Sequence, residues 1–376
     1  MSEVLRIGVV GGGLIAQAIH LPRIARLSDH FELVGIVDPS RTVREGLCAR
    51  YPSARPYAET QRMLDAEAPD CVLVCSPNAA HAESALAALD AGAHVLVEKP
   101  LCIDPADARL ICRRQEETGL VVQVGYMKRF DAAYESLLES LPVGRTDLRM
   151  IDVVTYDPYL PRAPFVSPDR LVVGADVPSQ LIDELRASER DQVEAAVGTV
   201  PAGSVRTFSE TYLACLVHDI NLVHGVVDHL GLEFPGTVIG SNHWAGGNAA
   251  DAFVRLSNGA SWHCAWLLLE GLEEFRESAS FYFDDVVHEL QFSAPYLVEH
   301  ATVHRIVSAD GARHRSESRQ RVADSYLAQL EHFHACIVDG AACRNPPEAA
   351  ALDVEVLRDL FRAHANAERE LSLGAA

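Results

Sequence analysis

Three glycines that directly follow an apolar run near the N-terminus have the spacing of a dinucleotide-binding turn. Gly11, Gly13 and Ala16 form the pattern Gly-x-Gly-x-x-Ala after the run 7–10. Gly11 permits a tight turn, Gly13 lets a pyrophosphate approach the backbone, and Ala16 lets a helix pack closely on a strand. The start of that helix offers free N–H groups and a partial positive charge to phosphates. A tight strand–helix turn that binds no ligand is the alternative interpretation.

A second apolar run, over 31–37, ends in an acidic residue, Asp38. Its distance from the glycines is about that of the acid that accepts a hydrogen bond from a ribose 2′-hydroxyl. The carboxylate would repel a 2′-phosphate, which favours NAD over NADP, whereas Arg41 nearby weakens that preference. Asp38 also precedes Pro39, so a turn-forming role is the alternative, and the two roles are compatible.

Lys99 lies at the end of another apolar run, 94–97, directly before Pro100. An ammonium group in a cleft can orient a substrate hydroxyl and stabilise the alkoxide that develops as its proton leaves. A surface lysine paired with Glu98 is the alternative.

His218 lies beside the apolar stripe of a helix predicted over 209–230, and Ala214 shares its face. An imidazole titrates near neutral pH and can accept a hydroxyl proton as hydride departs. The alternative is a hydrogen-bonded histidine at a domain interface. His224 and His229 follow at a spacing poorly suited to a shared metal, so no metal site is expected.

Apolar runs and helical segments alternate up to about residue 125. Further strands are predicted over 70–75, 94–97 and 120–124, and helices from 14 to a stop before Pro22, over 41–50, from 60, and over 81–91 and 105–118. Such alternation indicates a doubly wound parallel sheet covered on both faces, a Rossmann fold. Because the carboxyl ends of parallel strands meet at one edge, the residues after the strands should line one cleft. They are 11–13, Asp38, 76–78, 98–100 and 123–126.

From about residue 145 strands follow one another without helices between them. They are predicted over 148–156, 237–244, 250–256, 260–269, 278–283, 286–292 and 302–307, with helices over 179–197, 209–230, 322–339 and 348–370. This pattern indicates an α+β domain with a mostly antiparallel sheet. We therefore expect an NAD-binding Rossmann domain over 1–125 and an α+β domain over 126–345, to which the family resemblance described below assigns substrate binding and oligomerisation. The proline-rich stretch 157–208 resembles an insertion that shapes the substrate mouth or a subunit contact. The helix in 346–376 is expected to pack back on the Rossmann domain.

The composition excludes several classes of function. The 376 residues include 32 Lys and Arg against 53 Asp and Glu, which argues against nonspecific nucleic-acid binding. The hydrophobic fraction of 48% is typical of a soluble globular protein long enough for two domains. Neither a membrane span nor a signal peptide is expected. Nine cysteines without a Cys-x-x-Cys pair indicate reduced thiols in a cytoplasmic protein.

Four segments together resemble a known family. They are VEKPL at 97–101, CSPNAAH at 75–81, GYMKRF at 125–130 and HDIN at 218–221. In this order and spacing they resemble the Gfo/Idh/MocA oxidoreductases, which include glucose–fructose oxidoreductase and inositol dehydrogenase. The resemblance implies a nicotinamide-binding fold followed by a large open sheet that binds substrate and often mediates oligomers, here a homodimer or homotetramer.

The resemblance also implies an activity: NAD-dependent hydride transfer at a carbinol carbon of a sugar, cyclitol or sugar-derived metabolite. Lys99 matches the catalytic lysine of the family, and His218 matches its acid/base histidine. The family usually has an acid four residues before that histidine, where this chain has Ala214. An acid is also common three residues after it, where Asn221 stands. This departure leaves open a regulatory protein that senses NAD or a sugar, and an enzyme that cleaves glycosides with the help of NAD.

The residues expected at the site fall into three sets. The catalytic residues are Lys99 and His218. The cofactor-binding residues are Gly11, Gly13, Leu14, Ile15, Asp38, Ser76, Asn78, His81, Glu98, Lys99, Gln123 and Arg129. The substrate-binding residues are Lys99, Tyr126, His218 and Asp219. For Tyr126, Lys128 and Arg129, a turn that carries solvated charges is the alternative.

Overall fold

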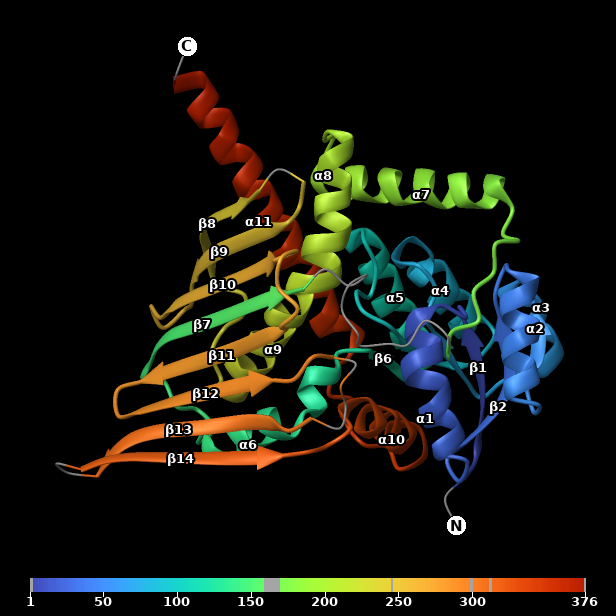
Figure 1. The fold of residues 1–376 in the computed structure, drawn as a ribbon, viewed down its shortest axis with the longest axis horizontal. Coiled ribbons are helices and arrows are strands. Elements are labelled where there is room, and N and C mark those ends of the chain that lie inside the picture. The colour runs from blue at the N-terminus through green and yellow to red at the C-terminus, as the bar shows by residue number, and fades with distance from the viewer. Residues whose placement is uncertain are drawn as a thin grey trace. The chain divides into compact units, whose positions relative to one another are not determined.

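The chain divides into two compact units in a computed structural model that describes residues 3–158, 170–244, 246–295, 297, 300–310 and 313–374 (Figure 1). The first unit comprises the described residues of Met1–Tyr126, Val166–Ala196 and Tyr326–Val354. The second comprises those of Met127–Phe165, Val197–Ser325 and Glu355–Ala376. This division assigns 326–345 and part of 157–208 to the first unit, whereas the sequence analysis expects both in the second domain. The C-terminal helix contributes to both units.

The first unit is built on a parallel sheet of six strands in the order β3-β2-β1-β4-β5-β6. The strands are β1 (Leu5–Val10), β2 (Phe31–Val37), β3 (Arg55–Tyr57), β4 (Cys71–Val74), β5 (His94–Val97) and β6 (Val122–Val124). All four residues of β4 are buried, because helices cover both faces of the sheet, and this explains the continuous apolar run. The predicted doubly wound sheet is confirmed. The sequence analysis missed β3, a short, largely exposed edge strand that contains Pro56.

Apart from the first, the helices of the first unit lie close to the ranges that the sequence predicts. They are α1 (Leu21–Arg26), α2 (Arg41–Arg50), α3 (Thr60–Glu67), α4 (His81–Asp90), α5 (Pro105–Thr118), most of α7 (Ser179–Val197) and α10 (Ser325–Val338). In α5, the Asp104 side chain accepts from the Ala106 N–H at 2.9 Å and Pro105 stands first in the helix. The helix ends at Gly119, whose φ of +67° suits only glycine well. Leu330 and Phe333 of α10 join the core around β1 and β2.

The helix after the glycine turn does not stop before Pro22, so that prediction was wrong. Residues 14–15 are α-helical, Ala16–His20 form the π-helical segment η1, and α1 continues through Pro22. Proline removes one backbone donor, and the change from i→i+5 to i→i+4 hydrogen bonding takes place just before it.

The second unit contains a sheet of eight strands in the order β14-β13-β12-β11-β7-β10-β9-β8. The strands are β7 (Leu148–Asp157), β8 (Thr237–His243), β9 (Ala249–Arg255), β10 (Ser261–Leu268), β11 (Arg276–Phe283), β12 (Val286–Phe292), β13 (Thr302–Asp310) and β14 (Arg313–Arg321). Neighbours pair antiparallel except β7 and β10, which are parallel. The prediction of a mostly antiparallel sheet is confirmed.

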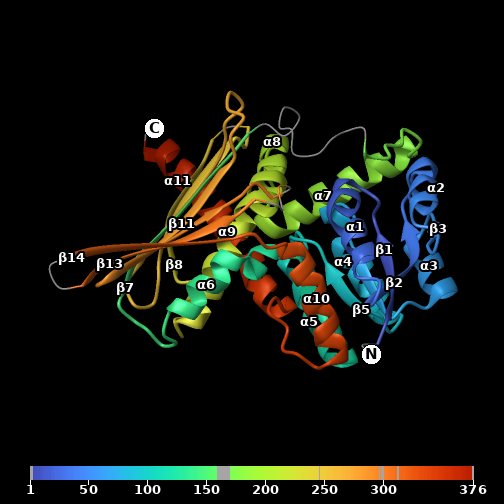
Figure 2. The same ribbon diagram turned by 60° about the horizontal axis from the view of Figure 1, so that its bottom comes forward.

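Helices cover one face of this sheet. They are α6 (Ala132–Ser140), the π-helical η6 (Thr207–Leu216) and α9 (Val217–His229). The short helix α8 (Ala202–Arg206) precedes η6, and α11 (Pro347–Gly374) follows at the end of the chain. Figure 2 shows α6 and α9 on the same side of the sheet. Buried residues alternate with half-exposed ones along β10 and β11, so the opposite face is left open. No helix in the described ranges has the length and apolar character to cross a membrane.

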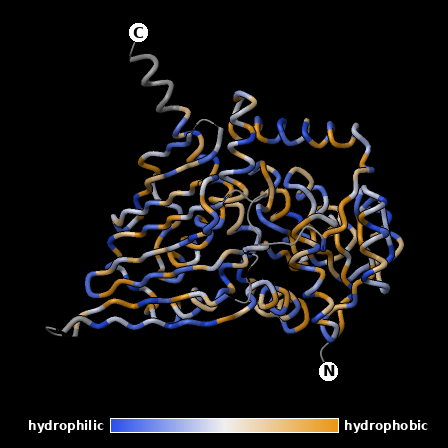
Figure 3. Tube along the Cα trace, viewed as in Figure 1, coloured by the Kyte–Doolittle hydropathy of each residue, from blue (hydrophilic) through white to orange (hydrophobic). Residues whose placement is uncertain are grey.

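The edge strand β14 was not predicted. Its sequence, RHRSESRQR, contains no apolar residue, yet it pairs with β13 along its whole length. Figure 3 shows it as one of the most hydrophilic strands. Charged side chains on an edge strand discourage pairing with other chains, and they also remove the alternation by which strands are recognised.

The cysteines agree with the expectation of reduced thiols. All nine are free, and burial raises the pKa of Cys71 and Cys75 well above its usual range.

Gly11→Ala is expected to lower the free energy of unfolding more than Gly92→Ala. Both glycines have positive φ, +96° and +83°, which costs a residue with a side chain about 1–3 kcal/mol. Only at Gly11 would the new Cβ meet backbone, 2.5 Å from the Cys75 carbonyl oxygen, while nothing lies within 4 Å at Gly92. Urea unfolding followed by circular dichroism measures both losses. Equal losses would mean that the backbone at Cys75 gives way.

Candidate functional site

The glycine turn joins β1 to the first helix at the carboxyl edge of the parallel sheet. Gly11 passes so close to the Cys75 carbonyl that no side chain fits there. Gly12 donates its N–H to the Asp38 carboxylate at 2.9 Å. Gly13 is exposed, and a Cβ built on it would meet nothing within 4 Å. The backbone at Gly13 is therefore open to a ligand, as the fingerprint requires.

Asp38 is held in a fixed orientation at the end of β2. One carboxylate oxygen accepts from Gly12, and the other accepts from the Ser40 N–H at 2.8 Å. Each oxygen keeps lone-pair capacity for a further donor. The half-buried side chain is thus placed next to the glycine turn, as predicted for a ribose ligand.

His81 links the segments that follow β4 and β5. Its ring nitrogens lie 2.8 Å from the Ser76 carbonyl oxygen and 2.7 Å from the Pro100 carbonyl oxygen. Burial lowers the pKa of His81, against the hydrogen bonds to both carbonyls, which favour the charged ring. The predicted cofactor residue His81 therefore joins the backbone after β4 to the backbone directly after Lys99. Ser76 keeps a buried hydroxyl with no hydrogen-bond partner among the described residues.

Glu98 forms a buried pair with a histidine of the first helix. The His20 Nε2 lies 2.7 Å from Glu98 Oε1, and the Lys99 N–H donates to Oε2 at 3.2 Å. Burial alone would raise the pKa of Glu98, but the hydrogen bond from His20 and the Lys99 ammonium bring it below its usual value. A charged Glu98 thereby fixes the backbone at Lys99, whose side chain is half-buried.

The other predicted cofactor residues of the first unit lie in different surroundings. Leu14 is 40% exposed and Ile15 is half-buried at the start of the helix, and Asn78 begins the short 3-10 helix η2 (Asn78–Ala80). Gln123 is fully buried and donates to the Gln329 carbonyl at 3.0 Å. The structure therefore gives Gln123 a packing contact with α10, and its role toward a cofactor stays a prediction.

Tyr126 is also interior, with 1% of its surface exposed. Its backbone carbonyl accepts from the Asn345 side chain at 3.1 Å. Its role toward a substrate stays a prediction.

In the second unit, His218 and Asp219 lie in the first turn of α9, directly after η6. π-Helical segments often occur at functional sites. The sequence analysis predicted one α-helix here, so it missed the i→i+5 hydrogen bonding of 207–216. This bonding changes the angular spacing between Ala214 and His218, both of which are half-buried.

Asp219 belongs to a buried cluster of charges. Its carboxylate lies 3.7 Å from the Lys128 ammonium and accepts from the Thr155 hydroxyl at 3.4 Å. The Lys128 ammonium also makes a short ion pair with Glu277. Burial, opposed by Lys128 and reinforced by Glu277, raises the pKa of Asp219 to about 8. Asp219 was predicted to bind substrate, but its side chain is only 2% exposed.

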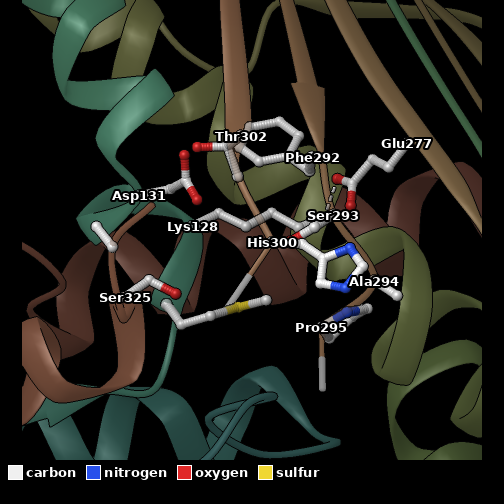
Figure 4. Close-up of a pocket in the computed structure, with 12 residues that line it drawn as sticks. Lys128, Asp131, Glu277, Phe292, Ser293, Ala294, Pro295, His300, Thr302 and Ser325 are labelled. Atoms are coloured by element: carbon white, nitrogen blue, oxygen red, sulfur yellow. Dashed lines mark hydrogen bonds and ion pairs between the residues drawn. The ribbon is translucent and has the colours of Figure 1, made fainter. Parts of the chain in front are cut away.

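A small pocket opens beside this cluster (Figure 4). Its lining includes Lys128, Asp131, Glu277, His300 and Thr302. The cavity volume of about 30 Å³ suffices for water and not for a sugar. The sequence analysis missed Glu277. In β11 buried and half-exposed residues alternate, and Glu277 is a charged residue at a buried position, which is the signal that could have identified it.

Arg129 packs on α9 from the same segment as Lys128. Its guanidinium is buried and donates to the Asn221 carbonyl at 3.1 and 3.0 Å. A Cβ on Gly225 would lie 2.8 Å from this guanidinium, so the glycine makes room for it. Arg129 thus fixes the helix that carries His218, and its predicted role toward a cofactor stays a prediction.

Asp219→Asn is expected to raise the melting temperature more at about pH 9 than at about pH 5. The folded-state pKa of about 8 exceeds the ordinary value of 3.8, so the folded state holds a proton that the unfolded chain releases. Stability is therefore lost as pH rises through this window, and asparagine removes the loss. Thermal unfolding at both pH values measures the effect. Asp152→Asn, at a half-exposed carboxylate beside His263, is the control. An equal shift at both pH values would contradict the raised pKa.

Comparisons with known proteins agree with this geometry. Residues 5–126 match the family model for the Gfo/Idh/MocA "Oxidoreductase family, NAD-binding Rossmann fold". A D-glucoside 3-dehydrogenase of Escherichia coli is 35% identical over 143 residues, which are 38% of this chain and 40% of the relative. An inositol 2-dehydrogenase of Cereibacter sphaeroides is 34% identical over 185 residues, 48% of this chain and 54% of the relative. The chain spans about half the length of the curated relatives it matches.

Solved structures match over nearly the whole chain. The UDP-N-acetylglucosamine 3-dehydrogenase of Acidithiobacillus ferrooxidans has a TM-score of 0.71 at 18% identity, over 96% of this chain and 98% of that one. A 3-ketoreductase of Actinomadura kijaniata, in complex with NADP and TDP-benzene, has a TM-score of 0.70 at 18% identity, with the same coverage. At such identity the likeness shows the fold. The family resemblance found in the motifs is confirmed for residues 5–126, which carry the Rossmann fold of this chain and match the Gfo/Idh/MocA family model.

Proposed function

We propose that the protein is an NAD-dependent oxidoreductase that transfers hydride between nicotinamide and a carbinol carbon of a sugar, cyclitol or sugar-derived metabolite. The observation that carries the proposal is the carboxyl edge of the first sheet, where Asp38 is held against the glycine turn. The relatives named as glucoside and inositol dehydrogenases support the substrate class.

The residues at this edge fit a dinucleotide. The open space at Gly13 suits a pyrophosphate, and the partnerless buried hydroxyl of Ser76 can take a polar group of a ligand. Asp38 can accept from a ribose hydroxyl while it keeps its two backbone donors. When bound, the nicotinamide would supply or accept the hydride.

Lys99 and His218 are proposed to handle the proton of the substrate hydroxyl. The Lys99 ammonium would orient the hydroxyl oxygen and stabilise its negative charge, and neutral His218 would accept the proton. Glu98, Pro100 and His81 hold the Lys99 backbone in place, and Arg129 holds α9.

The direct test mixes the purified protein and NAD with a panel of polyols and follows the near-ultraviolet absorbance of NADH. An increase with one or more polyols supports the proposal. Ala214, in place of the usual acid, favours a sensing protein as the second candidate, for which NADH binds without turnover. Cleaved glycoside without net NADH would favour NAD-assisted glycoside cleavage.

Lys99→Ala and His218→Ala are each expected to reduce kcat by about 10²–10⁴-fold while NADH still binds, because each removes a group that moves or stabilises the proton. Steady-state kinetics and NADH fluorescence titration measure the two effects. His229→Gln is the matched control on the same helix, because the His229 Nε2 lies 2.8 Å from the Leu141 carbonyl oxygen and His229 is not among the residues proposed for the site. Near wild-type turnover of His218→Ala would remove this histidine from the mechanism.

We further propose a cytoplasmic homodimer or homotetramer that associates through the open face of the second sheet. The free cysteines support a reducing compartment. Phe253, 49% exposed, stacks on His263 at 4.5 Å between ring centroids, and Met150 is 38% exposed. These apolar side chains belong to an otherwise half-exposed sheet face.

Phe253→Asp is expected to shift the protein toward the monomer, because it places a charge in the proposed interface. Light scattering after size-exclusion chromatography measures the mass. Val143→Asp, at an equally apolar but loop-borne residue that is 79% exposed, is the control and should not change the mass. An unchanged mass for Phe253→Asp would exclude this face as the interface.

A further inference from the structure

Residues 170–178, which we call the strap, lie against the first helices of the first unit. The Gln17 side chain pairs with the backbone of Val172: its Nε2 donates to the carbonyl at 3.0 Å, and its Oε1 accepts from the N–H at 2.8 Å. Arg50 donates to the Arg170 carbonyl at 2.7 Å. Three hydrogen bonds thus fasten the beginning of the strap.

The strap also packs closely on the dinucleotide turn and on α2. Gln17 Nε2 donates to the Gly12 carbonyl at 2.7 Å as well, so the strap and the glycine turn share one side chain. A Cβ on Gly46 would lie 2.8 Å from Val172, and a Cβ on Gly174 would overlap the Ser40 hydroxyl. The absence of side chains at these two glycines allows the close approach.

At its end the strap places a carboxylate on the N-terminus of α2. Asp176 accepts a short hydrogen bond from the Ser40 hydroxyl and a 3.1 Å bond from the Thr42 N–H. These bonds, from Ser40 first and then Thr42, lower the pKa of Asp176. A helix N-terminus favours an anion, and here the anion comes from the chain itself.

This position is the one that separates NAD from NADP. In the Rossmann fold the acid after β2 accepts from the ribose 2′-hydroxyl, and a 2′-phosphate needs cationic or N–H donors beside it. Ser40 and Thr42 lie two and four residues after Asp38, and both donate to Asp176.

The nearby arginines are engaged as well. Arg41 Nε donates to Glu45 at 2.7 Å, and Arg44 donates to the carbonyls of Asp38 and Pro39 at 3.1 and 3.0 Å.

The helix that follows the strap contacts the segment after β4. Helix α7 begins at Ser179, and Gln192 donates to the Ala79 carbonyl at 2.8 Å, on the segment that follows β4. Figure 1 shows the strap as the yellow-green coil that leads into α7. The segment therefore has contacts after β2 and after β4, on both sides of β1.

We propose that Asp176 is a specificity-determining residue of the cofactor site: its carboxylate takes the donors and the position that the 2′-phosphate of NADP would need, so the strap selects NAD. The inference rests on the proposed dinucleotide site. NADH leaves the strap in place, whereas NADPH must displace it against the repulsion of two carboxylates, Asp38 and Asp176.

Asp176→Ala is expected to raise the affinity for NADPH by about 10–100-fold, the equivalent of one or two charge-assisted hydrogen bonds, while that for NADH changes little. Fluorescence titration with NADH and NADPH measures both dissociation constants. Gly174→Ala should act in the same direction, because its Cβ pushes the strap off Ser40 without changing a charge. Asp183→Asn, at an exposed carboxylate of α7, is the control and should keep the wild-type ratio.

Hydrogen–deuterium exchange of the strap provides a second readout. Exchange of residues 170–178 should be unchanged or slower with NADH and faster with saturating NADPH. The inference is overturned if the wild-type protein binds NADH but both Asp176→Ala and Gly174→Ala keep the wild-type ratio of the dissociation constants for NADH and NADPH. That result would leave the proposed function standing. A wild-type protein that prefers NADPH overturns the inference. A wild-type protein that binds neither dinucleotide overturns the proposed function together with the inference.

Discussion

The parallel pairing of β1 with its two neighbours is the constraint on which the candidate site depends. Val10 is level with Val37 of β2 and with Val74 of β4. The chain therefore leaves all three strands at one height, where Gly11 donates to the Val37 carbonyl at 2.8 Å. A slip of one residue would move every side chain to the opposite face of the sheet, where it would meet other packing partners, and so the close packing of both buried faces holds the register. The contact between Gly12 and Asp38 is a consequence of this register.

Buried charge orients the residues proposed for chemistry. Transfer of ionised groups out of water is expensive, and their attraction in the interior often does no more than offset that cost. Both buried clusters adjoin a proposed catalytic residue: Glu98 precedes and binds Lys99 in the first unit, and Asp219 follows His218 in the second. Packed apolar side chains could stabilise the fold at these two clusters equally well. We therefore interpret the buried charges as groups that fix the positions of Lys99 and His218.

Local signals were sufficient for most of the fold. The helix predicted over 179–197 has those bounds in the structure, and the strands of both sheets follow from apolar runs and alternation. The failures have physical causes. The edge strand β14 contains only polar and charged residues, so it lacks the alternation of a strand. The segments η1 and η6 differ from α-helices in hydrogen bonding and not in composition, and Pro22 was read as a stop although the helix continues through it. Glu277 and Lys128 are 149 residues apart, so no local pattern could pair them.

The same limit applies to cofactor choice. In the sequence, residues 38–41 give a mixed signal, because Asp38 favours NAD and Arg41 weakens that preference. The structure brings Asp176 to Ser40 across 136 residues and pairs Arg41 with Glu45. On our proposal, the charge that selects NAD over NADP comes from this segment, which in sequence resembles a polar, proline-rich connection. A cofactor preference taken from the strand after the glycine turn alone is incomplete whenever a distant segment reaches the same helix N-terminus.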